Sequence, residues 1–385
     1  MNARSAIIVG AGIGGLTAAI ALQRSGWTAE VIERAPLIEA VGAGLTLQPN
    51  AMLALRRLKC ADEVEGVGAH LQFGGLRRAD GSPLSALSSA DADRIEEAVG
   101  APAIGIHRAT LHAALARQVD GLTLGTELTE YEGHGDGVLV TTADGRQRQA
   151  DLLVGADGIN SRVRASMLND GDPRYAGYYC WRGVASGDAG LPAGWAAEYW
   201  GDGLRFGGCT IDGDRTYWFA VQTGPPGGAT VDAGTTNRLR ALYSDFAPEV
   251  RRLLEATDPR AIIGGDIADR DPVAEWSRGR VTLLGDAAHA MTPNLGQGAC
   301  QAIEDALVLG DQLAGVDAAG VAAALSEYQR IRIPRANKTV RMARRVGNVA
   351  RMESRVGVAV RDGVLRATPS SMLRSQLTSA WKLPY

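Results

Sequence analysis

Residues 6–16 read AIIVGAGIGGL, and this stretch decides the fold of the 385-residue chain. The apolar run Ala6–Val9 predicts a buried parallel strand. The glycines that follow allow a tight turn, and Leu16–Ser25 carries apolar residues at helical spacing. A second strand is predicted over Thr28–Ile32 and ends at Glu33. Together these segments predict one strand–helix–strand unit of a Rossmann-like fold.

The glycines of this turn, Gly10, Gly12 and Gly15, have the G-x-G-x-x-G spacing of a dinucleotide-binding site. The first permits the turn, the second lets the backbone approach a pyrophosphate, and the third lets the helix pack on the strand. The positive end of the helix attracts phosphate. Glu33, at the end of the second strand, can accept a hydrogen bond from a ribose. A chance glycine turn is the alternative, and it would not explain the surrounding strand–helix–strand pattern.

Two further motifs each follow an apolar run that predicts a buried strand, at 151–156 and at 281–284. The first motif is GADGINSRVR at 155–164, and the second is GDAAH at 285–289, continued by PNLGQG at 293–298. A strand that ends in Gly-Asp can direct its carboxylate, here that of Asp286, at a ribitol or ribose hydroxyl. A helix beginning near Gly298 would point its positive end at a flat ring, and a reduced flavin carries negative charge there.

Composition narrows the class of protein. A net charge of −3 argues against a protein that binds nucleic acid. The four cysteines are Cys60, Cys180, Cys209 and Cys300, and their wide spacing argues against a disulfide framework or a zinc site. A reducing cytoplasm is therefore the expected compartment. No apolar stretch is long enough and free enough of charge to predict a membrane span.

The expected fold class is α/β. Aromatic residues gather between about 175 and 266, where short β-like runs alternate with Gly/Asp turns, so we predict an inserted, mostly antiparallel sheet there. The Rossmann-like FAD-binding domain is then discontinuous. We expect it over 1–72, 100–174 and 269–334, with a substrate-binding domain over 73–99 and 175–268 and a helical extension over 335–385.

The extension is basic, with eleven Lys/Arg and two acidic residues from Arg335 onward. An apolar stripe that includes Val340 and Ala343 predicts a packed helix with its arginines facing outward. A basic surface for nucleic acid or membrane is the alternative. The packed helix is favoured, because the apolar stripe needs a partner.

In order and spacing, the three motifs resemble those of the single-component (class A) FAD-dependent aromatic hydroxylases, which have the para-hydroxybenzoate hydroxylase fold. The resemblance covers nearly the whole chain. It is greatest to FAD-dependent urate hydroxylases, 3-hydroxybenzoate 6-hydroxylases and zeaxanthin epoxidases. The loop Gly42–Leu45, the helix that opens at Arg108, and the patterns Tyr175-Ala-Gly-Tyr178 and Trp181-x-Gly183 also belong to it.

The resemblance implies non-covalent FAD as the cofactor. NADH or NADPH is implied as a transient co-substrate without a Rossmann fold of its own, because the chain has no second G-x-G-x-x-G. The implied FAD-binding residues are Gly10, Gly12, Ile13, Gly14, Gly15, Glu33, Arg34, Gly44, Leu45, Arg108, Leu128, Asp157, Gly285, Asp286, Pro293, Gly296, Gln297, Gly298 and Ala299. No metal site is expected.

For the substrate, the resemblance points to Arg205, Tyr217 and Gln297 as catalytic residues. Arg205 and Tyr217 each have a structural alternative: Arg205 can be a solvated strand residue, and Tyr217 can be a ring packed in the sheet. Urate hydroxylases carry an aspartate where this chain has Asn294, which argues against urate. His289 is expected to be a structural hydrogen-bonding residue, and Glu304-Asp305 to lie on a helix face.

The implied reaction uses NAD(P)H and O₂ to hydroxylate a small aromatic or heteroaromatic compound through a flavin C4a-hydroperoxide. Two alternatives stay open from the sequence: an FAD-dependent epoxidase, and a flavin-binding redox module without hydroxylase activity. No nucleic-acid partner is expected, and the chain is predicted to be a monomer or a homodimer.

Overall fold

The computed structural model describes residues 4–38, 42–85, 87–134, 136–187 and 189–383. Its central sheet has the strand order β17-β18-β11-β1-β2-β7. The strands are β1 (Ser5–Val9), β2 (Thr28–Ile32), β7 (Leu122–Thr123), β11 (Leu152–Gly155), β17 (Ser277–Arg278) and β18 (Val281–Leu283). All neighbouring pairs are parallel except β17 and β18. The α/β fold class and the strands predicted at 6–9, 28–32, 151–156 and 281–284 are confirmed.

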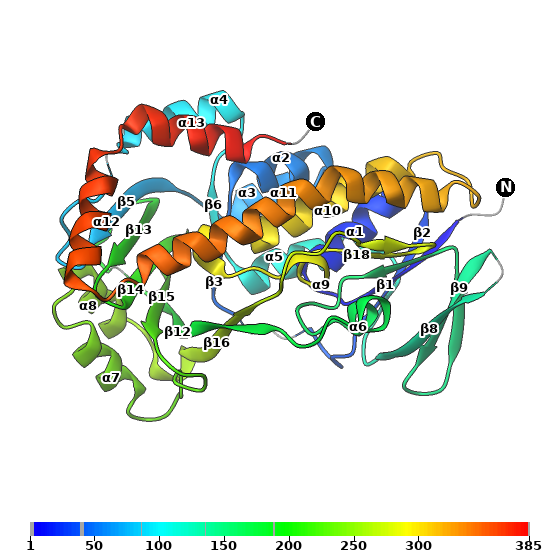
Figure 1. Ribbon diagram of the computed structural model, residues 1–385, viewed down its shortest axis with the longest axis horizontal. Coiled ribbons are helices and arrows are strands. Elements are labelled where there is room, and N and C mark those ends of the chain that lie inside the picture. The colour runs from blue at the N-terminus through cyan, green and yellow to red at the C-terminus, as the bar shows by residue number, and fades with distance from the viewer. Residues whose placement is uncertain (1–3, 39–41, 86, 135, 188, 384–385) are drawn as a thin grey trace.

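Helices and two small antiparallel sheets flank the central sheet (Figure 1). The helices here are α1 (Ile13–Arg24), α2 (Pro49–Arg57), α3 (Ala61–Val67), α5 (Arg108–Ala116), α6 (Arg162–Leu168), α9 (Asp286–His289) and α10 (Gly298–Leu313). One small sheet holds β8 (Leu128–His134), β9 (Gly137–Thr142) and β10 (Gln147–Ala150), and the other holds β3 (Gly44–Leu47), β4 (Ala69–His70) and β6 (Ile104–His107). The sheet containing β3 lies between the central sheet and the inserted one, so it connects the two halves of the molecule.

The inserted sheet has the order β16-β12-β15-β14-β13-β5. Its strands are β5 (Gln72–Arg78), β12 (Arg174–Ser186), β13 (Trp195–Trp200), β14 (Leu204–Asp212), β15 (Arg215–Thr223) and β16 (Ile263–Asp269), antiparallel except for β13 with β5. Alternate residues face opposite sides. Trp181, Trp218 and Phe206 pack in the core that includes residues of α7 (Thr235–Leu242) and α8 (Pro248–Glu255), so the other face is left for Arg205 and Tyr217.

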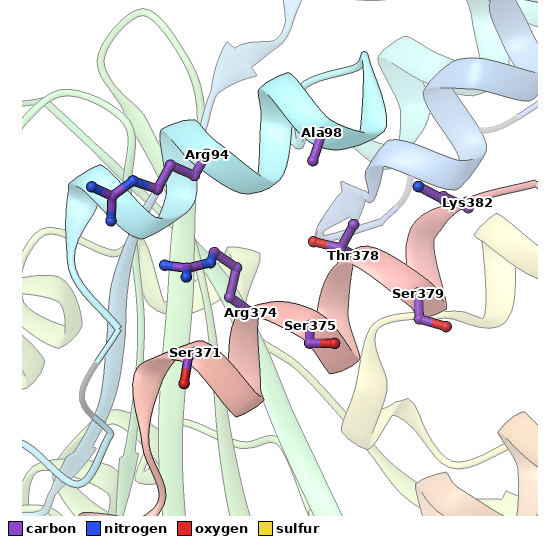
Figure 2. Close-up of a pocket in the computed structure, with 8 residues that line it drawn as sticks. All are labelled: Arg94, Ala98, Ser371, Arg374, Ser375, Thr378, Ser379 and Lys382. Atoms are coloured by element: carbon purple, nitrogen blue, oxygen red, sulfur yellow. The ribbon is translucent and has the colours of Figure 1, made fainter.

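The chain ends in α11 (Val321–Ala350), α12 (Arg355–Ala367) and α13 (Ser370–Trp381), and α13 packs beside α4 (Ser89–Val99) as Figure 2 shows. The domain boundary predicted between 334 and 335 falls inside α11. Pro334 does not end this helix. Arg332 and Arg335 both bind carboxylates of α10, which holds α11 against α10 on both sides of the proline.

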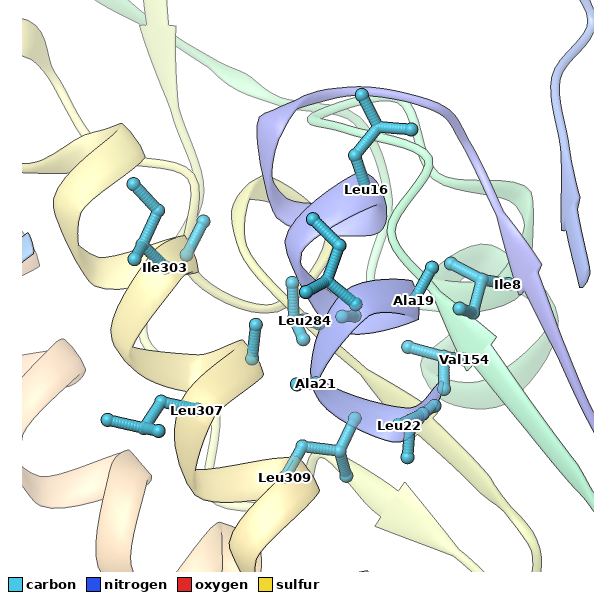
Figure 3. Packing of buried hydrophobic residues seen from close by; sticks show 14 of the residues in the cluster. Ile8, Leu16, Ala19, Ala21, Leu22, Val154, Leu284, Ile303, Leu307 and Leu309 are labelled. Atoms are coloured by element: carbon cyan, nitrogen blue, oxygen red, sulfur yellow. The ribbon is translucent and has the colours of Figure 1, made fainter. Parts of the chain in front are cut away.

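The main core lies where α1 packs on α10 and on the central sheet (Figure 3). Leu16, Leu22, Ile303 and Leu309 are almost fully buried there. The helices approach closely at Gly310, where a Cβ atom would lie 2.9 Å from the Cβ of Ala21. This packing fixes the start of α1 relative to the start of α10. In the described residues, no helix is long and apolar enough to span a membrane.

Candidate functional site

A cavity of about 220 Å³ opens at the carboxyl ends of β1, β2 and β11. In a parallel sheet, this end is where ligands bind. Six of the predicted site residues line it, namely Gly10, Gly12, Glu33, Arg34, Leu128 and Asp157. Eight further residues line it, and sequence reasoning missed the four of them that have polar side chains: Thr126, Glu127, Asn160 and Arg162. Asn160 and Arg162 belong to the GADGINSRVR motif, so the sequence could have predicted them as site residues. Thr126 and Glu127 lie in no such motif.

The glycine turn has the shape that a pyrophosphate needs. Gly10 has φ +102°, and a Cβ at Gly15 would lie 1.9 Å from the Gly10 carbonyl oxygen, so both positions require glycine. At Gly12 no atom lies within 4 Å of an added Cβ, so the backbone here faces open space. Ile13 follows as the first residue of α1. A phosphate can therefore approach the main chain at the positive end of a twelve-residue helix.

Glu33 is held in place by backbone groups. Its carboxylate accepts hydrogen bonds from the N–H of Ala11 at 2.8 Å and of Ala35 at 2.9 Å. Next to it, Arg34 is exposed and has no ion pair among the described residues. The site thus offers a fixed acceptor for a ribose hydroxyl and a cation at the rim of the cavity.

Asp157 lines the cavity but uses its oxygens to cap α6. It accepts hydrogen bonds from the Ser161 hydroxyl at 2.5 Å and from the Arg162 N–H at 2.7 Å. Burial raises the pKa of Asp157, and these hydrogen bonds oppose the rise. Arg162 in turn pairs with Glu127 at 2.7 Å across the cavity wall. Because both of its oxygens accept hydrogen bonds from the loop, Asp157 fixes the loop conformation and does not present a free carboxylate.

Asp286 offers a free carboxylate at the end of β18. Gly285 before it has φ +61° and ψ −138°, a conformation that only glycine adopts readily. Asp286 itself is exposed and makes no hydrogen bond among the described residues. Arg108, the exposed first residue of α5, is one of the charges that act on it. An acid and a base at neighbouring strand and helix ends can bind the hydroxyl and phosphate groups of a nucleotide.

The loop at 293–299 leads into α10. Pro293–Leu295 forms a 3₁₀ turn, Gly296 has φ +61°, and the half-exposed Gly298 and Ala299 open the helix. On the opposite side, Gly44 packs on Tyr217: a Cβ at Gly44 would lie 2.3 Å from the Tyr217 Cβ. Leu45 follows and is half-buried. The glycines leave main chain exposed at the start of α10, as contact with a flat ring requires.

The predicted catalytic role of Gln297 needs correction. Its side chain turns into the protein and is only 7% exposed. The amide nitrogen donates to the side-chain oxygens of Gln48 and Asn50. The amide oxygen accepts from Asn50 at 3.1 Å and from Gln301 at 2.8 Å. Every hydrogen-bonding position of this amide is occupied, so Gln297 holds the loop and has no donor left for substrate.

A buried ion network lies behind this loop and includes Glu304-Asp305. The helix face predicted for these residues belongs to α10, and both carboxylates have 0% exposure. Arg332 of α11 binds Glu304 at 2.5 Å and Asp305 at 2.7 Å. Asp305 also accepts from His289 at 2.6 Å and from the Gly285 N–H. His289 is thus a structural hydrogen-bonding residue, as predicted.

Arg205 is 2% exposed and firmly held. It donates to Glu198 from Nε at 2.7 Å and to the Asn294 side-chain oxygen at 2.5 Å. Asn294 in turn donates to the Ala343 carbonyl at 2.9 Å. An amide can accept from Arg205 and donate to a carbonyl at once, which an ionised aspartate cannot do. This double contact explains why asparagine fits at 294.

Tyr217 lies on the same face of the sheet as Arg205, four residues along β14 by register, or about 13 Å. Burial raises its pKa well above the usual range, and the neighbouring Arg182 opposes this rise only in part, so the hydroxyl stays protonated. Arg182 is a site candidate that sequence reasoning missed. Arg182 is the residue x in the Trp181-x-Gly183 pattern, and no role was predicted for it. Because side chains alternate along a strand, Arg182 lies on the face of the sheet that carries Tyr217, and Trp181 lies on the other face.

Comparison with known proteins adds to this geometry. Residues 4–343 match the family model of an FAD binding domain. The chain is 43% identical to an aurachin C monooxygenase/isomerase from Stigmatella aurantiaca over 94% of each chain. It is 34% identical to an FAD-dependent urate hydroxylase from Klebsiella oxytoca over 88% of each chain. The structure of Klebsiella pneumoniae HpxO with FAD and uric acid superposes with a TM-score of 0.90 at 30% identity, covering 98% of this chain and 96% of that one.

Proposed function

Because this chain belongs to the family of FAD-dependent aromatic hydroxylases and is an FAD-dependent monooxygenase, we propose how its residues divide the work. Residues 1–72, 100–174 and 269–334 hold FAD, and residues 73–99 and 175–268 cover the substrate. The observation that carries this division is the open backbone at Gly12, beside the fixed carboxylate of Glu33.

For the adenosine half of FAD, Glu33 would accept from the ribose, Leu128 would lie against the adenine, and Arg34 would face the adenosine from the cavity rim. Arg108 would neutralise the pyrophosphate, and Asp286 would bind the ribityl region. When bound, FAD supplies electron transfer and oxygen activation. The chain itself binds, orients and excludes water.

The substrate would lie above the sheet between Arg205 and Tyr217, whose backbone positions are about 13 Å apart. The Phe219 ring packs over Gly207 between them and would form the floor of the site. Glu198 already balances the charge of Arg205, while Arg182 has no ion pair among the described residues. Arg182 would therefore attract an anionic or carbonyl oxygen, and the protonated Tyr217 would donate to it and set the ring orientation. This site differs from that of the urate hydroxylases at position 294, where this chain has asparagine and they carry an aspartate.

Epoxidation followed by rearrangement is a second candidate reaction. The observation that favours it is the 43% identity to a relative named as both a monooxygenase and an isomerase. The same pocket would serve, because both reactions deliver one oxygen atom to an electron-rich carbon. Product structure separates the two: a hydroxylated ring supports the first, and an epoxide or a rearranged skeleton supports the second.

NADH or NADPH would reduce the flavin without a nucleotide-binding fold of its own. The cytoplasm would be the compartment, since all four cysteines are free thiols. A test of the function mixes the holoenzyme with NADH or NADPH and a panel of phenols, hydroxybenzoates, uric acid and aurachin C. Faster flavin reduction together with an oxygenated product supports the proposal. Uniform, compound-independent reduction that yields only hydrogen peroxide would contradict it.

A further inference from the structure

The end of the C-terminal helix α13 reaches the loop that leads into α10. Trp381, the last residue of α13, is 4% exposed and packs with Ile95 and Val99 of α4. Its indole N–H donates to the Gln48 side-chain oxygen at 2.5 Å. Residues 333 positions apart in the chain are thus joined by one hydrogen bond.

Gln48 carries this contact into the loop. Its amide nitrogen donates to the Leu295 carbonyl at 2.7 Å, and its oxygen accepts from Gln297 as well as from Trp381. One amide therefore ties α13 to two residues of the segment 293–298. Because both lone pairs of the Gln48 oxygen are occupied, loss of the indole N–H leaves an unmet acceptor next to Gln297.

A second contact links the same end of α13 to the buried ion network. Arg335 donates to the Ala380 carbonyl at 2.9 Å and binds Glu304 at 2.7 Å. Glu304 accepts from Asn50, which holds Gln297. Two adjacent residues, Ala380 and Trp381, thus reach Gln297 by separate routes. Both contacts join α13 to the interior of the protein, so α13 does more than cover the surface.

We propose that Trp381 is a positioning residue of the active site, acting through Gln48 to fix the loop 293–298. The inference rests on the proposed function, with the flavin ring of FAD lying against the exposed main chain of residues 296–298. Ser371, Arg374 and Ser379 of α13 also line the groove beside α4 (Figure 2). Arg374 pairs with Asp91 of α4 at 2.6 Å. Contacts along α13 therefore hold the helix in place, and the hydrogen bond from Trp381 to Gln48 links the helix to the loop.

The test uses iodide quenching of flavin fluorescence in the holoenzyme, which reports how well the loop shields the ring. Trp381→Phe keeps an aromatic ring and removes the N–H. We expect the quenching constant to rise about fivefold, as the loss of one hydrogen bond would allow, with FAD affinity and melting temperature little changed. Trp276→Phe is the matched control, since the buried Trp276 N–H has no partner among the described residues, and quenching should stay at the wild-type value.

Gln48→Met tests the same link from its other end, and it serves if Trp381→Phe disturbs folding. In a double-mutant cycle, Trp381→Phe should add nothing once Gln48 is Met. Wild-type quenching in both single variants, or additive effects in the double variant, would overturn the proposal. Gln297→Leu separates the two levels of inference. If Gln297→Leu exposes the ring and Trp381→Phe does not, only the role of Trp381 fails. If neither does, the placement of the ring fails as well.

Discussion

At Glu33, one carboxylate accepts two backbone N–H groups and lines the cavity that Gly12 opens. We predict that Glu33→Gln lowers FAD affinity by about ten- to a hundredfold, because hydrogen bonds to a charged group contribute about 1.5–3 kcal/mol. Fluorescence titration of the apoprotein with FAD measures this. Glu30→Gln is the control, since Glu30 lies on the same strand but binds Arg148 and Thr123 away from the cavity. Equal affinities in the two variants would contradict the assignment.

Arg182 and Tyr217 face the proposed substrate and have no assigned role in FAD binding. Arg182→Gln should weaken substrate binding by about ten- to a hundredfold, and Tyr217→Phe by about fivefold, with flavin retained. Both variants should release more hydrogen peroxide per NAD(P)H, because a loosely held ring misses the oxygen atom. The checks are product yield and peroxide assay. Tyr199→Phe, on the opposite face of the sheet, should behave as wild type. Wild-type coupling in both site variants would mean that the two residues are structural.

At the scale of elements, α10 and α11 are joined by a fully buried ion network. We predict that Arg332→Met destabilises the fold by about 3–5 kcal/mol, because it leaves the buried Asp305 without its arginine and the buried Glu304 with Arg335 alone. Urea unfolding of the apoprotein measures the change. The control is Arg330→Met two residues away, whose ion pair with Glu327 lies at the surface and should change stability little. Similar losses in both variants would rule out a special role for the network.

The same network predicts a dependence of stability on pH. Burial alone would raise the pKa of Asp305, but His289 and Arg332 lower it from 3.8 to about 2. The stabilisation by Asp305 is therefore complete above about pH 3.8 and is lost as pH falls toward 2. Asp305→Asn should lower stability at pH 7 and should lose that difference by pH 2. Unfolding curves at both pH values check this, and a difference that stays constant with pH would contradict the sign.

Elements that depend on local pattern could be predicted from the sequence. The strand Ala6–Val9, the glycine turn and Glu33 lie within one strand–helix–strand unit. The spacing of the apolar residues and the glycines of the turn were therefore sufficient to predict them. Strand alternation could also have placed Arg182 on the face of Tyr217. The direction of the Gln297 side chain could not be predicted, because its partners Gln48 and Asn50 lie nearly 250 residues away. The contact between Trp381 and Gln48 spans still more of the chain.

At the scale of the whole molecule, the central sheet and the inserted sheet form two halves (Figure 1). The nucleotide cavity lies at the central sheet, and Arg205, Arg182 and Tyr217 lie on one face of the inserted sheet. β3 lies between the two and contacts both β14 and β15, while α11 contacts α10 and the 293–295 turn. The proposed cofactor and substrate sites are therefore linked through β3, α10 and α11. This arrangement suits a reaction in which an oxygen atom passes directly from the cofactor site to a ring held on the sheet.

The most direct test is the source of that oxygen atom. The holoenzyme is supplied with NADH or NADPH and with the compound that most accelerates flavin reduction, under ¹⁸O₂ in ordinary water, and the product is analysed by mass spectrometry. An FAD-dependent monooxygenase predicts one heavy oxygen atom in each product molecule. A product that carries no label under ¹⁸O₂, or that takes its oxygen from H₂¹⁸O in the reciprocal experiment, would contradict it.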